Sequence, residues 1–546
     1  MTAFRGSARL PTLSRWVRLA ILAWIAIPVA LCVRIVFDKL PGWNVTQPGL
    51  NSTQPGIGKE VRLGGNPAQP SGLRTQSCFT SSCHGSLTPD LHEDAIRADE
   101  YFVWQNDPHA RAHQTLFGAR STAIFQRLGL TDDQLQPLTG QADRFQTAWT
   151  NCLACHETNR HLAALSSETE LPRVSLLKIV DRDPEGVSCE SCHGDARGWL
   201  HRHYRTDWKT LGNDHQQELG YIPGDNVAAR VKRCATCHVG SNAGDVNHDL
   251  IAAGHPALRF EYVWYSSRLP RHWMSGRRAA VAQGVGQHTG KDSAMAPADP
   301  TRDWLIGQLV TAIAALEQLE RRAAESETNG SWPELSEYNC FACHHDLKRD
   351  SWRRERGIPG LAATGSKKSR LVVPWGNWNL ELIQTIADQF GTEESQSFST
   401  SFGQLRDTFR DHLGPANPQF TIHSRTAREG IKKWLAGVEK LPDHEAAQVL
   451  NRLGESQSER LISSWDQTAG ALLGFAAPYH SANTIPEPLQ TAMDRVRFPD
   501  DLVDDVRVPV DSPRDFRSGR DGQSLTEDEW IALLMQLAEL KRVNDK

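Results

Sequence analysis

The sequence predicts a mainly α-helical protein with an apolar N-terminal segment, a motif-rich middle part and a helical C-terminal part. Three observations predict this class. Leu19 to Val33 is an unbroken apolar run. Ten of the eleven cysteines form five motifs, in each of which two cysteines are separated by two or four residues and the second is followed directly by histidine. Residues 371–546 contain no cysteine and carry apolar side chains at helical spacing. The 546 residues suffice for two or more domains, and the net charge of −5 gives no indication of nucleic-acid binding.

Residues 1–40 have the pattern of a membrane anchor or an export signal. Four arginines and no acidic residue precede the apolar run, and apolar residues continue past Arg34 to Phe37. No small-X-small cleavage site follows, so we expect an uncleaved transmembrane helix rather than a cleaved signal peptide. The positive charges place the N-terminus in the cytoplasm and the rest of the chain outside. Residues 41–76 are rich in Pro, Gly, Asn, Gln and Ser, which is typical of a flexible linker.

The five motifs lie in residues 77–354, and a histidine directly follows the second cysteine of each. Two cysteines three apart lie about one helical turn from each other, so both thiols can bond to one porphyrin while the histidine binds its iron. Disulfides do not require that histidine, and zinc sites usually pair two Cys-X-X-Cys motifs without it. In chain order, the first to fifth motifs are Cys78/Cys83/His84, Cys152/Cys155/His156, Cys189/Cys192/His193, Cys234/Cys237/His238 and Cys340/Cys343/His344.

We therefore predict five covalently attached c-type haems in a multihaem cytochrome c domain of short helices and loops around stacked haems. Such haems are attached on the far side of the bacterial inner membrane, which agrees with export. The first motif has four intervening residues, a rarer spacing. Cys32 alone belongs to no motif.

Histidine is also the expected distal ligand of most haems. Twelve further histidines lie between residues 77 and 350, against two methionines, so we expect low-potential bis-histidine haems suited to electron transfer. His109 and His113 are four apart after Pro108, so they share a helical face and either could cap a haem. We expect His92 and His288 to be ordinary histidines. The candidate distal ligands are His109, His113, His161, His201, His203, His215, His248, His255, His272 and His345.

One long helix is predicted from Asp299-Pro300 to about Glu325, where leucines recur at helical spacing. We expect it to pack against haems or a partner helix. Residues 355–370 have the composition of a surface linker, and residues 371–546 are predicted to form a haem-free helical domain. Thr526 and Glu529 form a capping box near its end. The four histidines of this domain lack metal-ligand spacing, and its function stays open.

Several stretches resemble the multihaem cytochromes related to cytochrome c-554, the electron acceptor of hydroxylamine oxidoreductase. They are the first motif with Tyr101-Phe-Val-Trp104 and Asp107-Pro-His109-Ala110, residues 186–194 with Trp199-Leu200 and His203, and Cys234 to Gly240 with Asn247 to Pro256. The resemblance covers roughly residues 77–350 and favours His109, His203 and His255 as distal ligands, followed by His248. The wider first motif, the fifth motif and the C-terminal residues depart from the family pattern.

The leading hypothesis is an exported, membrane-tethered pentahaem cytochrome on the periplasmic face of the inner membrane that passes electrons between redox partner proteins. The alternative is an oxidoreductase that acts on a small nitrogen or sulfur compound at one five-coordinate haem, since related tetrahaem cytochromes contain such a haem. A third hypothesis makes residues 371–546 a module that docks a redox partner. Beyond haem, no catalytic set is evident in the sequence.

Overall fold

The computed structural model shows helices and no β-strand in the part of the chain that it describes, which confirms the predicted class. The predicted anchor, the fifth haem motif and the capping box at Thr526 lie outside that part. Within it, no helix combines the length and the hydropathy that crossing a membrane requires. The described residues are 75–87, 98–132, 137–158, 185–224, 226–270, 272, 300–329, 332–338, 375–376, 378–411, 418–456, 465–479 and 485–496.

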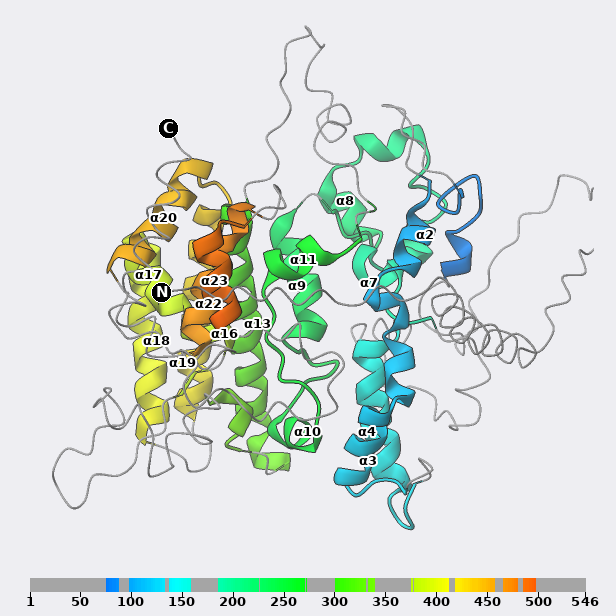
Figure 1. The fold of residues 1–546 in the computed structure, drawn as a ribbon, viewed down its shortest axis with the longest axis horizontal. Coiled ribbons are helices and arrows are strands. Elements are labelled where there is room, and N and C mark those ends of the chain that lie inside the picture. The colour runs from blue at the N-terminus through cyan, green and yellow to red at the C-terminus, as the bar shows by residue number, and fades with distance from the viewer. Residues whose placement is uncertain are drawn as a thin grey trace, which may run out of the picture. The chain divides into compact units, whose positions relative to one another are not determined.

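Short helices joined by loops make up the residues before 270, as predicted (Figure 1). α4 and α9 are longer than the rest, and each ends on a motif histidine, so the motif occupies its last turn. The helices are η1 (Thr75–Ser77), α2 (Glu100–Gln105), η2 (Pro108–Arg111), η3 (His113–Phe117), α3 (Ala119–Arg127), α4 (Ala142–His156), α7 (Cys189–His193), η4 (Ala196–Gly198), η5 (Thr206–Thr210), α8 (Asn213–Glu218), α9 (Val227–His238), α10 (His248–Ala253) and α11 (Tyr262–Arg268).

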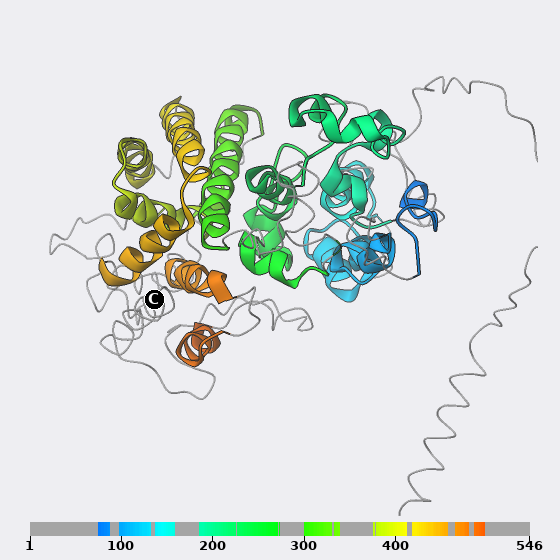
Figure 2. The same ribbon diagram turned by 90° about the horizontal axis from the view of Figure 1, so that it is seen from above.

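The long helix α13 (Pro300–Asn329) begins at the predicted proline but continues four residues beyond the predicted end. The prediction stopped at Glu325 because the leucine pattern ends before that residue, and only the structure shows that the polar residues after it stay helical. α13 packs against α9 and α11 on one side and against α16, α19 and α20 on another. Both ribbon views show it between the haem-motif helices and the C-terminal helices (Figures 1 and 2).

The C-terminal helices form a layered bundle in which α18 packs against α17 and α19, and α22 packs against α23. Their buried side chains belong to the same apolar core as those of α9, α11 and α13, so this core extends from Val231 to Met493. The helices are η6 (Leu335–Glu337), α16 (Trp378–Glu381), α17 (Ile383–Phe390), α18 (Glu393–Asp411), α19 (Pro418–Val438), α20 (Asp443–Ser456), α22 (Trp465–Ala476), η7 (Ala477–Tyr479) and α23 (Glu487–Val496).

Two polar contacts also join the C-terminal helices to the segment before α11. The indole Nε1 of Trp378 donates a hydrogen bond of 2.8 Å to the carbonyl oxygen of Phe260. Arg259 lies 3.6 Å from the carboxylate of Asp466 on α22. Because Phe260 packs on a motif histidine, these contacts connect the haem-free residues to the haem-motif region.

Candidate haem-binding site

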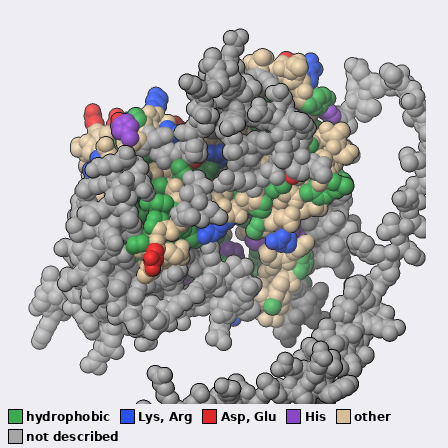
Figure 3. Space-filling view, turned by 45° about the horizontal axis from the view of Figure 1, so that its top comes forward, with side chains coloured by type: hydrophobic (Ala, Val, Ile, Leu, Met, Phe, Trp, Pro, Cys, Tyr) green, Lys and Arg blue, Asp and Glu red, His purple; other side chains and the backbone are tan. Residues whose placement is uncertain are grey.

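One large cavity collects all the described motifs. Its volume is about 2810 Å³, and every cysteine and histidine of the first four motifs lines it. Pockets for one small ligand usually hold about 300–1,000 Å³, so this cavity is large enough for several such groups. Figure 3 shows histidine side chains in a recess, with Lys or Arg side chains at its edge. The cavity and its donor set therefore fit several covalent haems.

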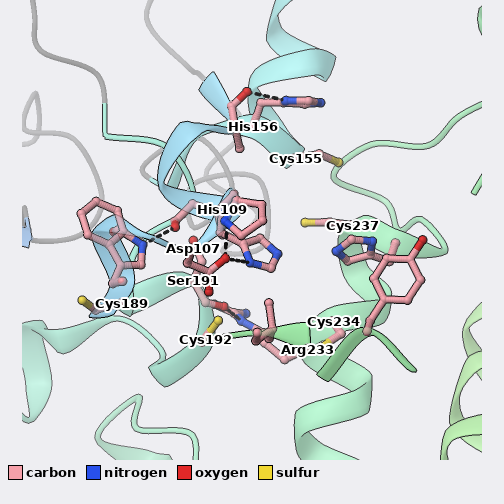
Figure 4. A pocket seen from close by; sticks show the side chains of 18 of the residues that line it. Asp107, His109, Cys155, His156, Cys189, Ser191, Cys192, Arg233, Cys234 and Cys237 are labelled. Atoms are coloured by element: carbon pink, nitrogen blue, oxygen red, sulfur yellow. Dashed lines mark hydrogen bonds and ion pairs between the residues drawn. The ribbon is translucent and has the colours of Figure 1, made fainter. Parts of the chain in front are cut away.

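The neighbouring thiols come from different motifs. The Cys78 thiol interacts with that of Cys189, and the Cys155 thiol with that of Cys237, which Figure 4 shows close together. The first motif thus lies beside the third and the second beside the fourth. The described motif cysteines are free of disulfides, and no three metal-binding side chains of the described part surround a common point.

Helix ends present three of the motifs to the cavity. The second and fourth motifs occupy the last turns of α4 and α9, and the third forms the short helix α7. The first motif is a turn, in which the His84 N–H donates to the carbonyl oxygen of Cys78 at 3.3 Å. Its wider spacing is therefore accommodated by a turn rather than by a helix.

Two glycines around the third motif allow close backbone approach. Gly194 has a φ of 85°, and a Cβ there would lie 2.0 Å from the carbonyl oxygen of Gly220. A Cβ on Gly186 would lie 2.4 Å from the carbonyl oxygen of His109. The Val187 N–H donates to that same oxygen at 2.9 Å. The third motif is thus held directly against the segment that carries His109.

Hydrogen bonds at Nδ1 orient five of the histidines in the cavity. Two are motif histidines: His84 bonds Glu100 at 3.1 Å, and His156 bonds the Ala112 carbonyl oxygen at 2.9 Å. A carbonyl oxygen only accepts, so His156 carries its proton on Nδ1 and leaves Nε2 free for a metal. This outer contact is characteristic of metal-binding histidines. The other three are predicted distal ligands: His109 bonds Asp107 (2.9 Å), His203 bonds the Leu200 carbonyl (2.7 Å) and His255 bonds the Pro256 carbonyl (2.8 Å).

The imidazole rings of three motif histidines each lie about 6 Å, centre to centre, from the ring of a second histidine. Two imidazoles that share one metal ion through bonds of about 2 Å have ring centres about 6 Å apart. The ring centres are 6.1 Å apart for His84/His203, 5.9 Å for His238/His109 and 6.3 Å for His193/His272. Each separation therefore suits an iron held between the two rings. Their interplanar angles differ, being 17°, 89° and 76° in the same order.

Burial keeps the inner motif histidines neutral, which is the form that binds a metal. It lowers the pKa of His193 and of His238 to about 4. The thiols respond in the opposite direction, because burial disfavours the thiolate. It raises the pKa of Cys234 to about 12.

His156 of the second motif differs from the other three. Among the described residues, no histidine ring packs against it as His203, His109 and His272 pack against theirs. His255 lines the same cavity, and a charge on His156 lowers the pKa of His255 after the larger effect of burial. The second motif is thus the described one without a paired imidazole.

Of the other predicted ligands in the described part, His113, His215 and His248 are not among the residues that line the cavity, whereas His201 is. His113 is buried against Phe117, and neither ring nitrogen has a hydrogen-bond partner in the described part. His248 begins α10, where its backbone N–H donates to Glu334 at 2.7 Å. His215 forms an exposed ion pair with Glu218. Cys340, Cys343, His344, His345 and His161 lie outside the described residues.

Some important residues have no signal in the sequence. The buried Thr158 side chain donates to the Gly186 carbonyl oxygen (3.0 Å) and accepts from the Ser188 N–H (2.7 Å). It thereby fixes the end of the second motif to the start of the third. Asp107 and Glu100 likewise have no pattern in the sequence that marks this role, although each orients a histidine. Only the folded backbone shows these pairings.

Glu261 supports the ring contacts of His238. Phe260 stacks on that imidazole at 5.1 Å and Tyr265 packs edge-on at 5.4 Å. Between them, the buried Glu261 carboxylate caps α11 by accepting from the N–H groups of Val263 (3.0 Å) and Trp264 (2.6 Å). Burial raises the pKa of Glu261 to about 7.

We expect this carboxyl to make stability fall as the pH rises. Its folded pKa of about 7 is above the ordinary 4.5, so the folded state binds the proton more tightly. The contribution is complete below pH 4.5 and is lost as the pH passes through 7. Denaturant midpoints of the parent protein and Glu261→Gln, measured from pH 5 to 8, should therefore diverge in favour of the variant. Parallel midpoint curves would contradict the assignment.

Comparison with known proteins agrees with the predicted resemblance over part of the chain. A family model described as cytochrome c554 and c-prime matches residues 80–194. This stretch includes the second and third motifs and most of the first, and there the predicted resemblance is confirmed. No curated protein and no solved structure is significantly similar to the chain.

Proposed function

We propose, from the similarity of residues 80–194 to cytochrome c554, that the chain is a pentahaem electron carrier. The cytochrome match implies covalent haem c, electron transfer and redox partner proteins. When bound, haem c accepts and releases single electrons. The single observation that carries the proposal is the cavity in which four complete attachment motifs converge. The fifth haem rests on Cys340, Cys343 and His344 of the sequence.

The residues of the chain would hold the haems close together and keep most irons six-coordinate. Adjacent thiols place the first motif beside the third and the second beside the fourth. Side-chain hydrogen bonds from Arg233 join the third motif to the fourth. The attachment segments therefore follow the spatial order first, third, fourth, second. If the paired imidazoles bind one iron each, the first, third and fourth irons would have no open position, which suits electron transfer rather than ligand chemistry.

The test of the proposal is the haem content of the full-length protein made in a host that attaches c-type haem. A pyridine haemochrome assay should give about five haems per chain, one for each motif in the sequence. Substituting both cysteines of the fifth motif by serine should reduce the content by one. Bound zinc without iron would contradict the proposal.

The interplanar angles predict different EPR signals. Bound to one iron, the near-parallel imidazoles of His84/His203 should give an ordinary rhombic low-spin signal. The perpendicular rings of His109/His238 would leave two orbitals of a bound iron nearly degenerate and should give a strongly anisotropic signal. His203→Ala should abolish the first signal, and His109→Ala should reduce the second, of which His193/His272 at 76° would keep a part. Each variant should show a new high-spin signal. His113→Ala is the matched control and should leave both signals unchanged. Loss of a low-spin signal in His113→Ala would assign the ligand to His113 instead.

A second candidate function, a reductase or dehydrogenase for a small nitrogen or sulfur compound, is favoured by the unpaired imidazole of His156. Among the described residues no second imidazole pairs with His156, and Arg120 and His255 line the same cavity. Nitrite and hydroxylamine are the probes for this site. A high-spin ferric signal in the parent protein that shifts with either compound would support the enzyme. Exclusively low-spin signals, unaffected by both, would support the carrier alone.

Export and membrane attachment are part of the proposal and rest on residues 1–40 alone. Alkaline washing of membranes should leave the haem protein in the pellet, and protease added to spheroplasts should digest it. Haem protein released to the periplasm without its first residues would identify the segment as a cleaved signal. Haem protein protected from protease in spheroplasts would contradict export.

A further inference from the structure

Arg233 bridges the attachment segments of two haem motifs. It lies on α9 directly before Cys234 of the fourth motif. Its guanidinium donates from Nε to the carbonyl oxygen of Ser191 and from Nη2 to that of Glu190, at 3.2 Å for the second bond. Both carbonyl groups lie within the third motif, between Cys189 and Cys192. Figure 4 shows Arg233 among Ser191, Cys192 and Cys234.

The charge of Arg233 lies in a poorly solvated environment. Burial lowers the pKa of its guanidinium, and smaller opposing effects come from the thiols of Cys192, Cys237 and Cys234. In the holoprotein these sulfur atoms would be uncharged thioethers. Charges interact more strongly in such surroundings than in bulk water. The Asp107 carboxylate also acts on Cys192, but it is bonded to His109.

We propose that Arg233 is a positioning residue that also sets the reduction potentials of the haems on the third and fourth motifs. Its planar fork fixes the third-motif backbone against α9, which a single ammonium group would do less well. Its positive charge favours the reduced iron, which carries one positive charge less than the oxidised iron, so it raises both potentials. The inference rests on the proposed haem binding.

Redox titration of the purified holoprotein, followed by visible absorption and EPR, tests this role. Arg233→Met removes the charge and both hydrogen bonds. We expect the reduction equilibria of two haems to shift at least about tenfold toward the oxidised form, which equals about 59 mV per electron. Lys232→Met is the matched control, because it removes one positive charge at the neighbouring position, which lies on the exposed face of α9. It should leave all potentials unchanged.

Arg233→Lys separates the two effects, because lysine keeps the charge but cannot bond both carbonyls in the same planar geometry. We expect nearly parental potentials and altered EPR coupling between the third-motif and fourth-motif haems. If Arg233→Met does not incorporate haem, the inference is tested with Arg233→Lys alone. EPR coupling in Arg233→Lys equal to that of the parent protein would then overturn the inference. Equal potentials in haem-loaded Arg233→Met and Lys232→Met would also overturn it. A parent protein without covalent haem would instead contradict the proposed function.

Discussion

A chain that ends at residue 370 should accumulate as insoluble or degraded protein without covalent haem. The helix α13 would lose the helices that complete its core. Its Trp304 is fully buried, and a Cβ on Gly474 of α22 would come within 2.6 Å of that ring. Its Leu316 is also fully buried, and the Leu316 carbonyl oxygen accepts a hydrogen bond of 3.0 Å from Ser424 of α19.

The expected effect is large because several apolar side chains are exposed together. Burial of one large apolar side chain stabilises a fold by about 1.5–3 kcal/mol. Exposure of the buried Trp304, Leu305, Leu309, Leu316 and Leu319 would therefore match or exceed the net stability of a typical protein, about 5–15 kcal/mol. The same α13 packs against α9, which carries the fourth motif. Collapse of this core should therefore prevent haem incorporation.

Soluble protein, haem staining and the visible spectrum would be compared between the full chain and residues 1–370. A milder version is Trp304→Ala, expected to cost about 3–5 kcal/mol. Glu317→Ala on the same helix is its control, since Glu317 is half-exposed in a surface ion pair worth about 0–1 kcal/mol. A soluble truncated protein with a full haem spectrum and slower reduction by partners would instead support a separable docking module.

The contrast between α13 and its surroundings explains how far the sequence is informative. Local patterns predict the start of α13, because proline at the first helical turn and a leucine repeat are both encoded within the segment. They also predict which cysteines and histidines belong together in one motif, since each motif occupies one turn of chain. The fusion of the C-terminal helices with the haem-motif helices into one core depends on contacts such as Leu316 with α19, far apart in sequence.

The predicted distal histidines show the same limit. A histidine surplus over methionine predicts bis-histidine ligation in general, and the cytochrome c-554 resemblance singles out His109, His203 and His255, followed by His248. It does not single out His272, because nothing near Pro270 distinguishes it from other histidines in the sequence. The distance of 6.3 Å between His272 and His193 is a property of the folded chain. The same applies to Arg233, whose hydrogen-bond partners are about forty residues away.

Arg322→Met should destabilise the protein by about 3–5 kcal/mol, since removing one partner leaves a buried charge uncompensated. Arg322 is on α13, where its Nη1 donates to Glu337 at 2.6 Å and its Nε to Asp245 at 3.1 Å. The Glu337 side chain is 2% exposed, and burial raises the pKa of its carboxyl. Asp245 follows the fourth motif by seven residues, and Glu337 precedes Cys340 by three. The two ion pairs of Arg322 therefore hold the segment after the fourth motif and the segment before the fifth motif against α13.

The matched control is Arg321→Met, the same chemical change at the adjacent position. Arg321 is 27% exposed and bonds Asp245 at 2.7 Å and Glu325 at 3.2 Å, so we expect a loss of about 1 kcal/mol. Denaturant unfolding of the holoproteins, followed by tryptophan fluorescence, gives the free energies. Adding Glu337→Gln to Arg322→Met removes the stranded charge and should recover more than half of the loss. Equal losses for Arg321→Met and Arg322→Met, or no recovery in the double variant, would show that the buried charge is not the cause.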